Sequence, residues 1–312
     1  MKDALFSMRE LLNPEPLTRR RLLAMVTAGL AGSRLGNLAL AQAPAAAGGT
    51  VRDRLWIFTC AANSDFPHIG RRSVTTPAEG AFFLGVPNII VVQSSESESR
   101  YGRMEPPLAP YTVALRPLQR VVWSVVGSGG FCSPAETEEV FSLARSTPNF
   151  TGVMLDDFFT GQKEGKRAQL TVPELAAIRR RLDAMDKRLE IFVTLYVTHL
   201  DLPLRDYLEL IDVITLWTGN PAELANLESN LSKAETLAPK TRKMLGCYVV
   251  DYGRKAGIPV SSMQLQCETG LRWLREGRIE GLIFLGNTTL DLGFESAEWT
   301  RQWIKKVGDT KL

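Results

Sequence analysis

The sequence predicts a (β/α)₈ barrel. Three observations predict this fold class: short apolar runs recur eight times, helical patterns separate them, and the segments after the runs are longer than those after the helices. Eight strands that alternate with helices over about 260 residues match the size and order of a closed parallel barrel. An open doubly wound sheet is the alternative, but Cys60–Ser64 lacks the glycine-rich turn that usually follows the first strand of such folds.

The eight predicted strands are four to six residues long and contain no internal proline. Their apolar residues run continuously rather than in alternation, which is typical of strands buried on both faces of a parallel sheet. The predicted strands are Leu55–Thr59, Asn88–Val92, Val121–Val126, Gly152–Leu155, Ile191–Tyr196, Val213–Trp217, Leu245–Val250 and Leu282–Leu285.

Start signals or apolar stripes mark six predicted helices between these strands. In Thr76–Glu79 an N-cap is followed by a proline at the first helical position and an acidic residue in the first turn. The segments before the third and sixth strands show no clear helical pattern. The six predicted helices begin at Thr76, Ser133, Thr171, Asn220, Ser261 and Ser296.

Residues 1–43 are predicted to be a twin-arginine signal peptide. The segment Thr18–Leu23 (Thr-Arg-Arg-Arg-Leu-Leu) matches the export motif, an apolar run follows to Leu40, and small-residue cleavage sites end at Ala41 or Ala43. The alternative is an amphipathic surface helix that contains arginines. The sequence therefore predicts a signal peptide over 1–43, a flexible lead-in over 44–52 and a single barrel domain over 53–312.

This division changes the charge of the chain. Of 37 basic and 34 acidic residues, the predicted signal holds six and three, which leaves 31 of each and a formal net charge of zero. A basic surface for nucleic acid is therefore not expected. After the predicted signal, the sequence contains no run of 18 apolar residues of the kind that spans a membrane. We expect the Tat translocase as a partner during export, and the periplasm or the cell exterior as the destination.

The best candidates for chemistry are Asp156 and Asp157, which follow the fourth predicted strand. Function in a (β/α)₈ barrel collects in the loops after the strands. Two crowded carboxyl groups perturb each other, so that one tends to keep its proton and can serve as an acid. The alternative is that one Asp caps a turn and the other is solvated.

The segment Phe150–Asp157 resembles the fourth-strand segment of several sugar-cleaving barrels. Phe150, Gly152 and Asp156 fit the chitinase-type pattern Phe-Asp-Gly-x-Asp-x-Asp-x-Glu, although Phe158 stands at the position of its catalytic Glu. The adjacent Asp-Asp is similar to the pair of the hexosaminidases that remove N-acetylglucosamine from proteins. That resemblance implies that Asp156 orients and polarises the acetamido group of the substrate, and that Asp157 is the general acid/base.

A third carboxylate, Asp251, follows the seventh predicted strand. Many retaining glycosidases place the acid/base on the fourth strand and the nucleophile on the seventh, so Asp157 and Asp251 would fit that layout, and their separation would predict retention or inversion. Alternatively, Asp251 initiates a turn at Gly253.

Side chains at other strand ends could bind a sugar. Flat aromatic rings stack on sugar rings while their polar tips meet hydroxyl groups, and an amide can bind a hydroxyl directly. Packing at the barrel mouth, or a turn at Gly286-Asn287, is the alternative for each of them. The candidate substrate-binding residues are Tyr196, Trp217, Tyr252, Phe158 and Asn287.

No cofactor is predicted. The turn Gly127–Gly130 could cradle a phosphate, but no P-loop lysine and threonine follow it, and we interpret it as a turn beside the cleft. His68 and His199 could serve as ligands of a metal ion, although histidines from unrelated loops are more often solvated. Cys60, Cys132, Cys247 and Cys267 allow three disulfide pairings, between which the sequence cannot choose, and Cys247 is expected to be buried.

These observations favour an exported glycoside hydrolase-like barrel that acts on a carbohydrate by carboxylate acid/base catalysis. The alternatives are a metal-dependent barrel hydrolase and a carbohydrate-binding barrel without catalysis, because a barrel fold by itself does not fix the chemistry.

Overall fold

The structure is a computed structural model that describes residues 49–312 except 66–68, 96–101 and 162–165. The predicted signal peptide and residues 44–48 of the predicted lead-in lie outside the described residues, as does His68. Their assignment stays a prediction.

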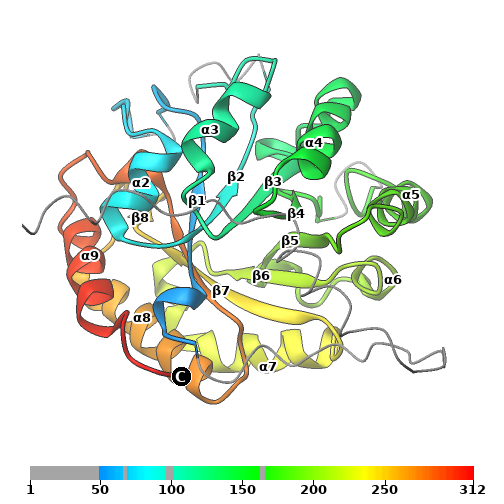
Figure 1. Ribbon diagram of the computed structural model, residues 1–312. Coiled ribbons are helices and arrows are strands. Elements are labelled where there is room, and N and C mark those ends of the chain that lie inside the picture. The colour runs from blue at the N-terminus through cyan, green and yellow to red at the C-terminus, as the bar shows by residue number, and fades with distance from the viewer. Residues whose placement is uncertain (1–48, 66–68, 96–101, 162–165) are drawn as a thin grey trace, which may run out of the picture. The chain divides into compact units, whose positions relative to one another are not determined.

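Eight parallel strands close into a barrel, and helices surround it (Figure 1), which confirms the predicted fold class. The first strand, β1, pairs with β2 on one side and with the last strand, β10, on the other, and this closes the ring. Because all eight strands are parallel, their carboxyl ends lie at the same face of the barrel. The barrel strands are β1 (Leu55–Thr59), β2 (Asn88–Val91), β3 (Arg120–Val126), β4 (Phe150–Leu155), β5 (Glu190–Tyr196), β6 (Val213–Trp217), β7 (Arg242–Tyr248) and β10 (Leu282–Leu285).

The seventh strand differs from its prediction. It begins at Arg242, three residues earlier than expected, and ends at Tyr248. Beyond it the chain forms a separate small hairpin from β8 (Val250–Asp251) and β9 (Ala256–Gly257). The barrel strand therefore ends within the continuous apolar run. Val249 and Val250 continue that run because they are also buried, but they do not pair in the barrel sheet.

The predicted helix starts are largely confirmed. Thr76 and Glu79 form a complete capping box, and Ser133 caps its helix through the backbone N–H of Glu136. The segment after Asn220 begins instead as a 3₁₀ helix, η7 (Pro221–Asn226), before it becomes α-helical. The α-helices are α2 (Pro77–Leu84), α3 (Thr112–Leu115), α4 (Pro134–Ser146), α5 (Val172–Asp183), α6 (Arg205–Leu208), α7 (Leu227–Leu237), α8 (Val260–Arg275) and α9 (Glu295–Val307).

Apolar side chains form two layers, one inside the barrel and one between the strands and the helices. Alternate residues of β5 illustrate the division, because Phe192 belongs to the inner layer while Ile191 and Val193 belong to the outer one. Thr194 and Tyr196, two and four residues after Phe192, therefore face the barrel interior near its carboxyl end.

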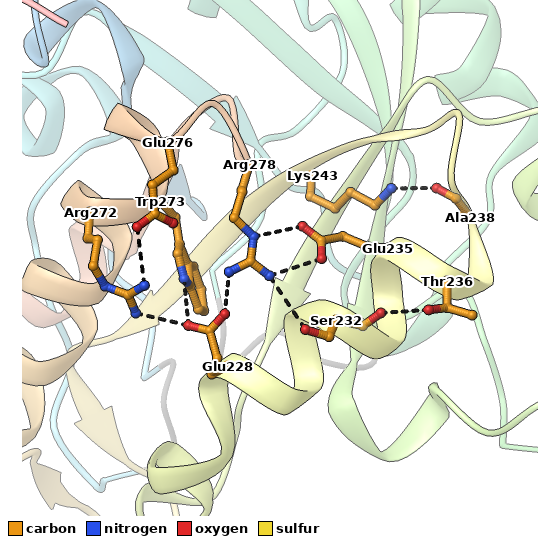
Figure 2. Close-up of polar contacts among 10 residues, drawn as sticks. All are labelled: Glu228, Ser232, Glu235, Thr236, Ala238, Lys243, Arg272, Trp273, Glu276 and Arg278. Atoms are coloured by element: carbon orange, nitrogen blue, oxygen red, sulfur yellow. Dashed lines mark hydrogen bonds and ion pairs between the residues drawn. The ribbon is translucent and has the colours of Figure 1, made fainter.

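A charged cluster joins α7 to α8 on the outside of the barrel (Figure 2). Arg278 lies between Glu228 and Glu235 and donates hydrogen bonds to both. Glu228 also accepts from Arg272 at 2.9 Å and from the indole N–H of Trp273 at 3.0 Å. No helix among the described residues is long and apolar enough to cross a membrane.

Candidate active site

Asp156 lies inside the barrel mouth, directly after β4. Its side chain is 5% exposed, and one carboxylate oxygen accepts a hydrogen bond of 2.8 Å from the Thr194 hydroxyl. Burial raises the pKa of Asp156 well above its usual value, and the neighbouring charge of Asp157 raises it further. Asp156 therefore tends to keep its proton.

Asp157 is half-buried and has a φ of +44°, in the left-handed region that non-glycine residues rarely occupy. Continued β geometry would point its side chain away from that of Asp156, so this turn of the backbone keeps both carboxylates at the mouth. One oxygen accepts a hydrogen bond of 2.5 Å from the Tyr196 hydroxyl, and the other accepts from the Gly129 N–H at 2.9 Å. Strained residues at strand ends often mark functional sites.

Strand β5 therefore supplies one hydroxyl to each carboxylate. Thr194 and Tyr196 are two residues apart, which places both side chains on the inner face of the strand. Thr194 is a functional candidate that the sequence analysis missed. A polar residue two positions before a tyrosine, in an otherwise apolar strand, was the available signal.

Tyrosines from two further segments border the carboxylate pair. Tyr248, the last residue of β7, packs against Trp217 with ring centres 5.1 Å apart and against Tyr252 at 5.4 Å. Burial raises the pKa of the Tyr252 and Tyr196 hydroxyls, and the charges of Asp156 and Asp157 add to this effect. The sequence analysis missed Tyr248 because its predicted strand ran two residues beyond it.

Trp217 forms part of the barrel interior rather than an open platform. It is 2% exposed, and its indole N–H donates to the Thr215 hydroxyl at 2.9 Å. The residue facing it must be glycine, because a Cβ on Gly246 would lie 2.1 Å from the indole ring. These contacts favour the packing alternative for Trp217, whose ring also packs against that of Tyr248.

Phe158 and Asn287 are both fully buried, which favours the packing and turn alternatives over contact with a substrate. Phe158 packs in the outer layer against Phe159 and Tyr207. The Asn287 amide binds the Cys60 backbone through both its oxygen and its nitrogen, at 3.0 Å and 2.9 Å. Asn287 therefore joins the carboxyl end of β10 to that of β1.

Asp251 initiates a turn. One of its carboxylate oxygens accepts from the backbone N–H groups of Gly253 and Arg254, at 2.9 Å and 3.1 Å, and Arg254 lies 3.7 Å from the other oxygen. These contacts fit the turn alternative, and a role as nucleophile stays an untested hypothesis.

The glycine-rich turn after β3 leaves no backbone donor for a phosphate. The Gly129 N–H is committed to Asp157, and the N–H groups of Gly127, Ser128 and Gly130 all donate to backbone carbonyls within 2.7–2.9 Å. The turn instead holds Asp157 in place, beside the site as expected.

His199 lies on η6 (Val197–His199), with its ring 5.5 Å from that of Tyr196. Partial burial lowers its pKa, against the opposing effect of Asp157. In the described part of the chain, no group of three or more His, Cys, Asp or Glu side chains could hold a metal ion. All four cysteines are free thiols, and Cys60, Cys247 and Cys267 are buried.

No family model matches the chain, and no curated protein matches its sequence. Solved structures do resemble it. A protein of Bacteroides thetaiotaomicron VPI-5482 assigned as an alpha-L-fucosidase has a TM-score of 0.56 at 12% identity, over 91% of this chain and 99% of that one. A xylanase and alpha-amylase inhibitor protein, XAIP-III, reaches 0.53 at 11% identity, over 82% and 98%.

YKL-39, solved in the presence of chitooligosaccharides, has a TM-score of 0.52 at 11% identity and covers 82% of this chain and 100% of its own. At such low identities these likenesses show the fold, which this chain shares with barrels that include glycoside hydrolase-like proteins. They carry no residue assignment, so the function has to be argued from the carboxylate site.

Proposed function

We propose that the protein is a carbohydrate-processing barrel that cleaves a glycosidic bond by carboxylate acid/base catalysis. One observation carries this proposal: two adjacent carboxylates at the carboxyl end of β4 are each held by a separate hydroxyl of β5. Their location at the face where barrel enzymes carry their chemistry supports it, as does the shared fold with sugar-cleaving barrels.

The two aspartates differ in environment, and the proposed roles follow from this difference. Asp157 is the more exposed, so it is the one to touch the substrate as general acid/base. In that role it donates a proton to the departing glycosidic oxygen while the substrate's own acetamido oxygen attacks the anomeric carbon. It later takes a proton from the water that attacks this carbon and releases the acetamido oxygen. Asp156, buried and inclined to keep its proton, can donate a hydrogen bond to a substrate oxygen. An acetamido group is the substrate feature that the resemblance to hexosaminidases suggests.

A carbohydrate-binding barrel without turnover is the second candidate. Phe158 occupies the position of the catalytic Glu in the chitinase-type pattern, and its side chain is fully buried. The site therefore lacks the acid of that pattern, and proton transfer to the leaving group depends on Asp157 alone.

A turnover screen distinguishes the candidates. The protein from Gln42 onward, beside Asp157→Asn, is assayed on aryl glycosides that include N-acetylhexosaminides, with and without chelator. Turnover that the variant loses and that chelator leaves unchanged supports the glycosidase. Sugar binding without turnover supports the binding barrel, and activity only with added metal supports a metal-dependent hydrolase.

We also propose export by the twin-arginine route, which the segment Thr18–Leu23 supports. Replacing Arg19 and Arg20 together by Lys should retain the chain in the cytoplasm of an expressing bacterium. Unchanged export of this variant would count against the Tat signal.

A further inference from the structure

A cavity of about 420 Å³ lies outside the barrel wall, lined by residues of β2, β3, the start of α2, α3 and the loops after β1 and β2. Trp123 of β3 lines it as part of the outer layer, whereas its neighbour Val122 belongs to the inner layer. None of the candidate site residues in the described chain lines this cavity. It is therefore separate from the carboxylate pair, and its volume is within the range of roughly 300–1,000 Å³ that is typical of small-molecule sites.

The walls of the cavity are mostly apolar. Tyr111, from η3 (Ala109–Tyr111), adds an aromatic ring that is 39% exposed, and its hydroxyl accepts from the backbone N–H of Glu105 at 3.2 Å. Burial of apolar surface therefore favours a ligand that is itself mostly apolar. The apolar lining includes Ala61, Val91, Met104, Pro110, Ala114 and Leu115.

The Trp123 side chain is fully buried, and its indole N–H has no hydrogen-bond partner among the described residues. The indole groups of Trp217 and Trp273, by contrast, donate to Thr215 and Glu228 at 2.9 Å and 3.0 Å. A buried donor without an acceptor raises the free energy of the folded state. Because Trp123 lines the cavity, a ligand that carries an acceptor atom would satisfy this donor.

The positive charge at the cavity is already compensated. Arg103, which lines it from the loop after β2, donates to Glu136 at 2.5 Å and lies 3.8 Å from Glu105. The Arg103 and Glu136 side chains are only 11% and 8% exposed. An anion that competed for Arg103 would leave the buried Glu136 carboxylate without this partner, which is costly. The surroundings therefore favour an uncharged ligand.

Contacts between neighbouring segments hold the walls in place. A Cβ on Gly102, where φ is +64°, would lie 2.4 Å from the carbonyl oxygen of Ala62, so the loops after β1 and β2 pack directly on each other. The backbone N–H of Leu108 donates to Glu139 on α4 at 2.7 Å. A cavity whose walls are fixed before binding loses less conformational entropy when a ligand enters.

We propose that this cavity is a second binding site, for an uncharged and mostly apolar small molecule whose oxygen accepts the hydrogen bond of Trp123. The proposal goes beyond the proposed function, because none of the groups that carry it takes part in the carboxylate chemistry.

Acetophenone is the probe, since it is uncharged and joins an apolar ring to one carbonyl acceptor. It is titrated into the ¹⁵N-labelled protein from Gln42 onward, and the indole N–H signal of Trp123 is identified by its loss in Trp123→Phe. We expect this signal to move downfield with a saturable dose dependence and a Kd on the order of 1 mM. α-Methylstyrene has nearly the same shape without the oxygen, so it should shift the signal less.

Two variants of α3 test whether the probe occupies the cavity. Ala114→Leu places a larger side chain in the lining and should weaken acetophenone binding about tenfold or more. Val113→Leu is the matched control, because Val113 is 56% exposed and does not line the cavity, and it should change the Kd by less than about twofold. Both positions are exposed, so both variants should fold.

Three outcomes of these titrations would overturn the proposal: no saturable shift of the Trp123 signal, an equal shift with α-methylstyrene, or a Kd that Ala114→Leu leaves unchanged. Benzoate, the anionic analogue, should bind more weakly than acetophenone because of the buried Glu136 carboxylate. Tighter binding of benzoate would overturn the assignment to an uncharged ligand.

Discussion

The Thr194 hydroxyl donates to the Asp156 carboxyl at 2.8 Å within the closed barrel, where Asp156 has almost no contact with solvent. This bond favours the ionised form of Asp156, whereas burial and Asp157 oppose it and dominate. The folded protein therefore binds a proton at Asp156 more strongly than the unfolded chain does.

Asp156→Asn should become progressively more stable than the unmodified protein as the pH rises. Because the folded-state pKa lies above the unfolded value of about 3.8, the unmodified protein loses stability from about pH 4 upward until the folded carboxyl has ionised. Each unit of the pKa difference corresponds to about 1.4 kcal/mol. The measurement is the free energy of unfolding of both proteins from pH 4 to pH 9. A difference that stays constant with pH would show that Asp156 is not held in its protonated form.

Asp157→Asn should abolish turnover and leave the fold intact. Asn occupies left-handed φ about as readily as Asp. Its amide oxygen can still accept from the Gly129 N–H, while its NH2 group can donate to the Tyr196 hydroxyl oxygen, which accepts as well as donates. We expect kcat to fall by about 10²–10⁴-fold, with a free energy of unfolding changed by less than about 0.5 kcal/mol. Asp157→Ala is the contrasting variant, because the φ of +44° strains alanine and adds about 1 kcal/mol of destabilisation. Turnover retained in Asp157→Asn would remove Asp157 from the chemistry.

The sequence predicts much of this fold because a parallel barrel leaves strong local signals. Strands buried on both faces read as continuous apolar runs, and helix caps such as Thr76 with Glu79 are short-range. The location of Asp156 and Asp157 after β4 follows from the same pattern. The one-turn helices α3 and α6 left no signal because four residues cannot show helical periodicity.

The orientation of individual site residues was less predictable. Strict alternation would turn Phe158 to the same side as Asp156, but the left-handed φ of Asp157 sends it into the outer layer. The Asn287 amide donates to the backbone carbonyls of Cys60 and Thr75, which lie more than 200 residues earlier in the chain. A local sequence pattern cannot predict contacts over such a separation. Thr194, by contrast, could have been found as the hydroxyl that interrupts an apolar strand.

Asn287→Ala should destabilise the barrel without a direct effect on sugar binding. The substitution leaves the Cys60 backbone N–H and carbonyl and the Thr75 carbonyl without the partner that now binds them at 2.7–3.0 Å. Buried polar groups without partners are costly, so we expect a loss of about 2–4 kcal/mol in the free energy of unfolding. Asn226→Ala, at an exposed position, is the control and should be nearly neutral. A selective loss of sugar affinity at unchanged stability would restore Asn287 as a binding residue.

Glu228→Gln should weaken the junction of α7 and α8 at neutral pH but not in acid. Hydrogen bonds from Arg278, then Arg272 and Trp273, lower the pKa of Glu228 to about 2 (Figure 2). A depressed carboxylate pKa contributes stability above the unfolded value of 4.5, and this contribution is lost as the pH falls towards 2. The side chain is 52% exposed, so solvent screening limits the expected loss to about 1 kcal/mol at pH 7.

The matched control for this cluster is Glu276→Gln, because Glu276 is similarly exposed and has one longer contact, 3.4 Å to Arg272. Chemical denaturation of both variants at pH 7, 4 and 2.5 and in low and high salt is the measurement. The Glu228 effect should shrink in acid and in high salt, while the Glu276 effect stays small throughout. If the Glu228 effect persists at pH 2.5, the side chain stabilises the junction through its shape and neutral hydrogen bonds, and the ion pairs with Arg278 and Arg272 contribute little.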